Sequence, residues 1–309
     1  MRFSVKHEVG IAGIILLATA VLTIAVPDAP SQAVNSNSAF ITVIALLIIF
    51  FGALLYLHPK KAQATADIFL IIAVVMFLWE VLLGKLALLD PFIFPGPARV
   101  FRVFEIDWQQ MLAGVVSSLE ILSVGYVIAL VTAIPIGLYI GWKKRLFGAA
   151  YPIAKAVSPI PPTVYLPYAI VLLPTFAASS TFLIFIGAFW PVLVGSVYGV
   201  FSIDPRLINS ARILSLPESR MIQRILFPAA MPSIFSGALI ALIMSFITLT
   251  VAEMIAATSG LGWYIQYHHQ FANYDRVIAG MILIMVVVVA VMYLFDRIQA
   301  YSLRWQNTQ

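Results

Sequence analysis

Long apolar segments limit what this chain can fold into. Several uninterrupted apolar stretches reach or exceed the roughly 20 residues that a helix needs to cross a bilayer. Of the 309 residues, 62% are hydrophobic and only 10% are charged, whereas a soluble domain is about half apolar and a quarter charged. The stretches do not alternate strictly between apolar and polar residues, which favours helices over a β-barrel. The sequence therefore predicts an all-α polytopic membrane protein.

About eight transmembrane helices are expected. One segment, 148–173, contains five prolines, which predicts a broken or kinked span whose freed carbonyls face protein or water. The expected spans are 9–26, 38–57, 67–88, 110–142, 148–173, 179–201, 229–257 and 277–296.

The basic residues predict which side of the membrane each loop occupies. If the polar stretch 202–228 is cytoplasmic, alternation of eight spans places thirteen of the eighteen Lys and Arg residues on the cytoplasmic side. Four would lie outside and Lys155 would lie within a span. This is the positive-inside bias of a plasma or bacterial inner membrane protein, and it predicts that both termini are cytoplasmic.

Several function classes are excluded or disfavoured by absent residue patterns. The chain has no cysteine, so it has neither a disulfide framework nor a cysteine metal site. It has no Gly-x4-Gly-Lys-Ser/Thr loop to hold a nucleotide phosphate, so it is not expected to be an ATPase or to carry a cofactor of its own. The net charge of +5 reflects topology rather than nucleic-acid binding.

The polar stretch between the sixth and seventh expected spans contains four arginines. Asp204 suits a helix N-cap and Pro205 suits the first turn, and Leu207, Ala211 and Leu214 recur at helical spacing. A proline at 217 predicts a break, followed by a second short helix that ends at Pro228. The alternative interpretation is a solvated amphipathic loop.

This stretch resembles the EAA loop of permease subunits in ABC importers. Asn209-Ser210-Ala211 stand at its first three positions, Ser215 at its glycine, and Ile225 and Pro228 near its end. The spacing matches without a gap, while Asn209, Ser210, Ser215 and Phe227 depart from the usual identities. The resemblance implies contact with an ATPase through Asp204, Leu207, Asn209, Ser210, Ala211, Arg212, Leu214, Ser215, Ile225 and Pro228.

Further segments resemble the same family in order along the chain. They are 118–145, the proline-rich 157–171, 189–214 and the Glu and Gly-Leu-Gly segment 252–265. They are similar to permeases that import sulfonates, taurine, nitrate or bicarbonate. The resemblance implies a type I importer core over residues 62–309. Residues 1–61 form an additional transmembrane hairpin outside it.

The resemblance also implies partners. Two ATPase subunits would bind ATP and Mg²⁺, a second permease copy would complete a homodimer, and an extracytoplasmic binding protein would deliver a small solute. The chain itself would be a transport subunit rather than an enzyme. ATP-driven closure of the ATPase pair would move the loop segments and switch the packed spans between inward and outward opening.

Polar residues within the spans are candidates for the substrate pathway, because such groups in a membrane require a polar partner or water. Small hydroxyl residues also allow close helix packing, so a structural role is the alternative. Glu80, Glu120 and Glu253 are likewise open between structural and functional roles. The candidate pathway residues are Ser158, Thr163, Tyr165, Tyr168, Ser245, Thr248 and Glu253.

Two other functions remain open at this stage. A transporter that acts alone would show an internal repeat with paired broken helices, and only one proline-broken segment is evident. An importer of the same class could instead carry a vitamin precursor or an aromatic acid.

Overall fold

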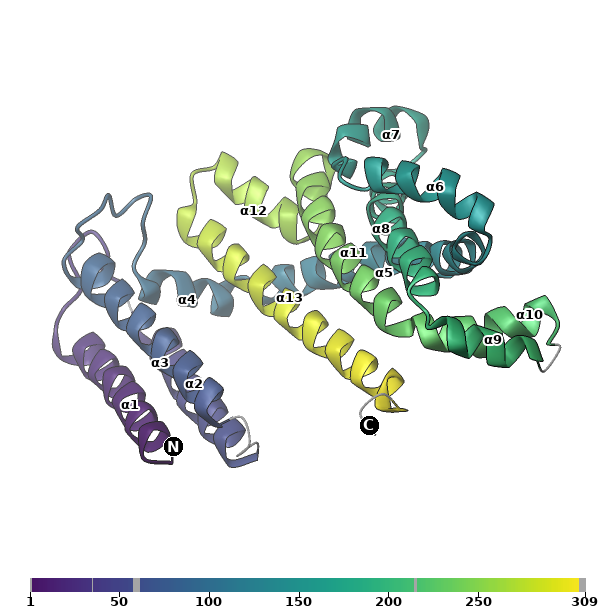
Figure 1. Ribbon diagram of the computed structural model, residues 1–309. Coiled ribbons are helices and arrows are strands. Elements are labelled where there is room, and N and C mark those ends of the chain that lie inside the picture. Colours follow the sequence, from purple (N-terminus) through teal and green to yellow (C-terminus); the bar gives the residue numbers. More distant parts are fainter. Residues whose placement is uncertain (1, 35, 58–61, 214–215, 306–309) are drawn as a thin grey trace. The chain divides into compact units, whose positions relative to one another are not determined.

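The apolar stretches form helices in the computed structural model, which describes residues 2–34, 36–57, 62–213 and 216–305, with the side chains of residues 2–6 excepted. Every regular element in these ranges is a helix (Figure 1). The predicted all-α fold class is confirmed. Two of the residues expected to contact the ATPase, Leu214 and Ser215, lie outside the described ranges.

Seven helical stretches among the described residues are long and apolar enough to cross a membrane. Their boundaries lie close to the expected ones, and the second agrees at both ends. They are α1 (Arg2–Ala25), α2 (Ser38–Leu57), α3 (Ala62–Trp79) with its extension η2 (Glu80–Lys85), α5 (Trp108–Trp142), α8 (Phe176–Phe201), α11 (Phe227–Ala256) with the short helices before it, and α13 (Tyr274–Ser302).

The expected fifth span is divided. Its residues form α6 (Lys144–Val157), the 3-10 turn η3 (Pro162–Tyr165) and the short α7 (Leu166–Leu172). Pro159, Pro161 and Pro162 lack the amide hydrogens that a continuous helix needs, which accounts for the interruption. The carboxyl-terminal ends of α5 and α8 both lie beside the same short helix, α9 (Pro205–Ile213). The divided segment between them must therefore lead the chain from the end of α5 to the opposite end of α8, where α8 begins.

Two of the expected connectors are partly helical. Residues 90–108 contain α4 (Pro97–Ile106), and residues 258–276 contain α12 (Leu261–Gln270). Both segments were expected only as connectors.

The polar stretch 202–228 forms a helix, a break and a second helix, as predicted. The backbone N–H of Arg206 donates to Asp204 Oδ1 at 2.8 Å, so Asp204 caps α9. After the break come α10 (Glu218–Met221) and the π-helical turn η4 (Ile222–Leu226). The expected helix end at Pro228 is wrong. The N–H of Phe227 bonds Ile222 O, five residues back, and this wider turn lets the chain pass Pro228 into α11 without a break.

The chain divides into two compact units. The first comprises 1–112 and 267–282, and the second comprises 113–266 and 283–309. In the first unit, aromatic residues of α2, α3 and α4 form the core, including Phe40, Phe51, Phe69 and Phe101. The expected domain boundary near residue 61 marks where the resemblance to the permease family begins, and not where one compact unit ends. It stays a prediction.

Buried polar groups also hold the first unit together. The Thr23 hydroxyl donates to Glu80 Oε1 at 3.0 Å, and Lys85 Nζ lies 3.2 Å from the same oxygen and 2.7 Å from Asp28. An unpaired charge in a span would be costly. This network therefore favours a structural role for Glu80, which connects η2 to α1 through its hydrogen bond with Thr23.

Small residues bring three helices together in the second unit. Residues 125, 129, 133, 137 and 141 of α5 are all Gly or Ala at intervals of four, which places them on one helix face. A Cβ on Gly137 would lie 2.5 Å from Ser196 Cβ of α8, and one on Gly237 of α11 would lie 2.7 Å from Pro191 O of α8. The helix α8 thus packs tightly against both α5 and α11.

Adding a methyl group at Gly137 is expected to separate α5 from α8. The Gly137→Ala variant should lose about 1–3 kcal/mol of stability, as overpacked sites do. The control is Gly148→Ala, where a Cβ meets nothing within 4 Å. It should be neutral or slightly stabilising, because alanine favours helix. Thermal unfolding in detergent measures both, and equal transitions would contradict the close packing.

Removing the cap of α9 should loosen its first turn. Asp204→Ala is expected to cost about 1 kcal/mol locally, which corresponds to about fivefold faster amide exchange at 206–208. Asp204→Asn keeps an acceptor and should exchange nearly as the wild type does. Hydrogen exchange with mass spectrometry resolves the segment, and unchanged protection in Asp204→Ala would show that the cap is not needed.

Candidate functional site

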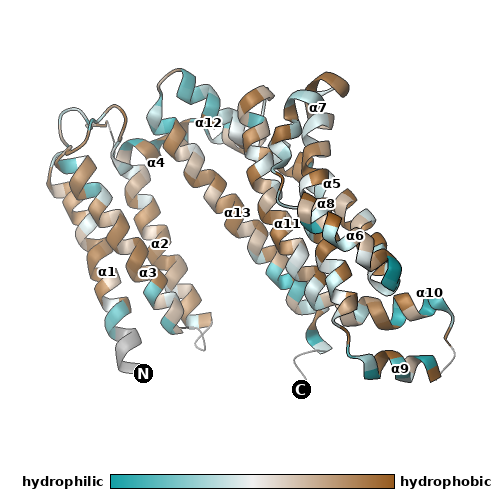
Figure 2. Cartoon of the chain, turned by 45° about the horizontal axis from the view of Figure 1, so that its top comes forward, coloured by the Kyte–Doolittle hydropathy of each residue, from teal (hydrophilic) through white to brown (hydrophobic). Residues whose placement is uncertain are grey.

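The helix α9 has one buried face and one exposed face. Ala211 is 3% exposed and belongs to a cluster with Leu138, Val200, Met221 and Leu226. Ile208 packs against the same cluster. The opposite face of α9 presents side chains to solvent, and it consists of Arg206, Leu207, Asn209, Ser210, Arg212 and Ile213. Figure 2 shows the mixture of hydrophilic and hydrophobic residues along α9 and α10.

The end of α5 is tied to this segment by charge. Lys143 Nζ lies 2.6 Å from Glu218 Oε1, and this hydrogen bond raises the pKa of the Lys143 ammonium above its ordinary value. The Arg212 guanidinium lies over the Trp142 ring at 5.7 Å, within the range of cation–π attraction. The α9–α10 segment is therefore fixed to α5 as well as to α11.

A cavity of about 500 Å³ lies beside α9, between the ends of α5 and α8. Trp142 and Phe201 form part of its apolar wall, and Lys144, Asn209 and Arg212 supply polar groups. An apolar floor with a basic rim suits a protein partner that inserts an apolar side chain and presents acidic groups around it.

The predicted contact residues fall into distinct positions. Leu207 is 44% exposed, so it is available to a partner, whereas Ala211 supports α9 from below. Ile225 and Pro228 are half-buried in and after η4. Ile213, which the sequence reasoning missed, is 84% exposed. Its position three residues after Ser210 places it on the exposed face, and this spacing could have identified it.

At the other end of α11, Glu253 lies in a buried hydrogen-bond network. Two donors bond its carboxylate directly, and a third donor bonds the Ser118 hydroxyl. Ser118 Oγ of α5 donates to Glu253 Oε1 at 2.6 Å, and the N–H of Gly262 donates to Oε2 at 2.8 Å. The N–H of Leu261 donates to Ser118 Oγ at 2.9 Å. The carboxylate is 1% exposed. Ser118, Glu253, Leu261 and Gly262 are called the Glu253 network below.

The other candidate pathway residues do not gather at one open site in this single chain. Ser245 and Thr248 of α11 are buried, and Ser245 Oγ donates to Ala241 O of its own helix. Thr248 lies beside Gly187 of α8, which also contacts Pro162 at the break. The remaining four lie in or beside the broken segment, where Ser158, Thr163 and Tyr165 are half-buried and Tyr168 is 70% exposed.

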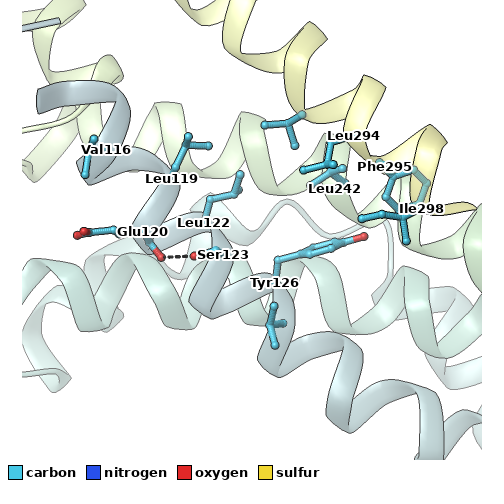
Figure 3. A pocket seen from close by; sticks show the side chains of 12 residues that line it. Val116, Leu119, Glu120, Leu122, Ser123, Tyr126, Leu242, Leu294, Phe295 and Ile298 are labelled. Carbon is cyan, nitrogen blue, oxygen red and sulfur yellow. Dashed lines mark hydrogen bonds between the residues drawn. The ribbon is translucent and has the colours of Figure 1, made fainter. Parts of the chain in front are cut away.

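A groove of about 570 Å³ lies between α5, α11 and α13 (Figure 3). Its walls are almost entirely apolar, and the Tyr126 hydroxyl of α5 donates to Ala238 O of α11 at 2.7 Å. Glu120 lines one end, is exposed, and directs its carboxylate away from Tyr126 (Figure 3). Apart from Glu120, Ser123 and Tyr126, the residues that line the groove are apolar, so it offers few groups to a small ion. The Glu120 carboxylate requires water or a partner.

Two curated proteins with assigned transport systems are similar to this chain. The nitrate import permease of Synechocystis is 33% identical over 171 residues, which are 55% of this chain and 62% of that protein. The taurine transport system permease of Escherichia coli is 29% identical over 240 residues, which are 74% of this chain and 85% of that protein.

A solved structure shares the fold. The inward-facing MetNI methionine ABC transporter contains a chain that aligns with a TM-score of 0.56 and 20% identity, covering 64% of this chain and 98% of that one. The family model for the binding-protein-dependent transport system inner membrane component matches residues 133–306, which include the whole of α8, α9, α11 and α13. The chain belongs to this family and is a multi-pass membrane permease subunit of an ABC importer, which works with ATPase and solute-binding partners.

Proposed function

We propose that this permease forms a homodimer that imports a small anion, such as nitrate, bicarbonate or a sulfonate including taurine, and that two ATPase subunits drive it by docking on α9. The exposed face of α9 is the observation that carries the docking. It holds Leu207, Ser210 and Ile213 on a capped helix whose other face is anchored in the permease core. An amphipathic helix of this kind fits a groove on a partner.

Charge and topology support the proposed orientation, in which both termini are cytoplasmic. Lys143 contacts α10, so the basic residues after α5 and the arginines of α9 lie at the same end of the second unit. The carboxyl-terminal end of α13 lies at that end as well (Figures 1 and 2). Basic loops favour the cytoplasmic side. If the broken segment 144–172 provides an eighth crossing beside the seven long helices, both termini would lie on the cytoplasmic side.

The exposed polar groups support a second permease copy. Glu120 and Tyr168 are exposed in segments that the membrane would surround, and a carboxylate facing lipid would be costly. A route between two copies would give Glu120 water. In that route the broken segment supplies Thr163 and Tyr165, while the buried Ser245, Thr248 and Glu253 shape its wall. The proposed substrate class rests on the similarity of this chain to the nitrate import permease and to the taurine transport system permease.

Reconstituted vesicles provide the test of the substrate. The permease is combined with its ATPase and its binding protein, and ATP hydrolysis is measured with nitrate, bicarbonate, taurine, an alkanesulfonate, a hydroxymethylpyrimidine and an aromatic acid. We expect stimulation by one anion of the nitrate, bicarbonate and sulfonate group. Stimulation by the pyrimidine or the aromatic acid alone would contradict the proposed substrate class and leave the permease role intact.

A charge on the exposed face of α9 should weaken ATPase docking. Leu207→Asp is expected to lower the amount of co-purified ATPase about tenfold, because a carboxylate would be desolvated in an apolar contact. The permease should keep its thermal transition, since Leu207 lies outside the core.

The matched control is Tyr301→Asp, which places the same charge on an exposed aromatic residue in the last turn of α13. It should retain the ATPase. Full retention by Leu207→Asp as well would show that α9 is not the docking element.

A further inference from the structure

Resting on the proposed docking of an ATPase at α9, we propose that Glu253 is a positioning residue that makes the loop 257–260 and the start of α12 follow the movement of α9. The Glu253 network lies at the end of α11 remote from α10. It is the point at which α5, α11 and this loop meet through hydrogen bonds.

One helical stretch connects the two ends. The elements α10, η4 and α11 follow one another without interruption over 39 residues, Glu218–Ala256. At a rise of 1.5 Å per residue this is about 58 Å. The stretch begins at Glu218, where Lys143 holds it, and ends three residues beyond Glu253. A displacement of α9 and α10 is thereby passed to Glu253.

Three contacts along this stretch hold α5 to it. Lys143 pairs with Glu218 beside α9, Tyr126 bonds Ala238 O midway, and Ser118 bonds Glu253 at the far end. Two helices joined at three levels move as one body rather than sliding past each other. The last contact differs from the other two because it also includes the loop.

The loop approaches the carboxylate too closely for any side chain. Gly260 has a φ of +118° and lies against the carboxylate of Glu253, and a Cβ on Gly262 would meet Glu253 Cβ at 2.9 Å. Gly114 of α5 faces Gly260, where a Cβ would lie 3.4 Å from Gly260 C. A positive φ is a conformation that glycine adopts readily. The glycines therefore allow the backbone to bind the carboxylate directly.

The chain contains no cysteine, so single reporters can be introduced. Thr258→Cys reports on the loop and Ser219→Cys reports on α10, and both positions are exposed. The permease–ATPase complex in nanodiscs is labelled with a maleimide, with and without ATP and vanadate, and the label on the permease is quantified.

In the otherwise native chain, nucleotide should change the labelling rate at both reporters, by about fivefold as for a moderate coupling between sites. In Glu253→Gln the amide cannot accept both hydrogen bonds, and in Ser118→Ala two bonds are lost. Both variants should abolish the nucleotide response at 258 and keep it at 219. The control Ser196→Ala removes a buried serine that bonds only its own helix, and it should keep both responses.

Each other outcome has a definite meaning. Labelling at 258 could be faster in Glu253→Gln while the ratio of the rates with and without nucleotide stays unchanged. That result would show that Glu253 only stabilises the loop, and would overturn the inference. Absence of a response at 258 in the otherwise native chain, with a response at 219, would overturn it as well. Absence of a response at 219 would refute docking at α9, and the inference would fall with the proposed function.

Discussion

The close approach of α5, α8 and α11 is the constraint on which the second unit depends. Lipid does not drive two apolar helices together, so association in a membrane relies on contact between small residues and on hydrogen bonds. Gly137, Gly195 and Gly237 allow α8 to touch both neighbours at backbone distance. The resulting body carries α9 at one end and the Glu253 network at the other. A movement at either end therefore involves the whole body.

Charged side chains within the spans serve this architecture in different ways. Glu80 is neutralised by Lys85 and tied to α1 through Thr23. Glu253 binds a hydroxyl and a backbone N–H, and so fixes a loop. Glu120 is exposed in a single chain, and it is the residue of the three that needs a neighbouring copy or water. Their local partners thus separate three residues that look alike in the sequence.

Much of the fold follows from local signals in the sequence. The apolar run 38–57 predicted α2 at both ends, and Asp204 with Pro205 predicted the start of α9. The departures have non-local or unusual causes. Pro228 does not end a helix, because a π-helical turn precedes it. Ala211 is buried because α9 packs against Leu138 and Leu226, and the spacing of residues within α9 does not reveal these contacts. The Glu253 network depends on backbone N–H groups of the Gly-Leu-Gly segment, and the sequence pattern marked that segment without showing that it bonds Ser118 and Glu253.

Site-directed cross-linking along α9 tests the central claim, that its exposed face is the coupling surface, most directly. Single cysteines are introduced into the cysteine-free chain at 206, 207, 208, 210, 211 and 213. In the co-expressed importer, each is joined to the ATPase by oxidation to a disulfide with an ATPase cysteine or by a short bifunctional reagent. The account predicts links to the ATPase from 206, 207, 210 and 213 and none from 208 and 211, the half-buried and buried positions that face the permease core. Links from the buried positions, or none from the exposed face while the ATPase remains bound, would contradict it.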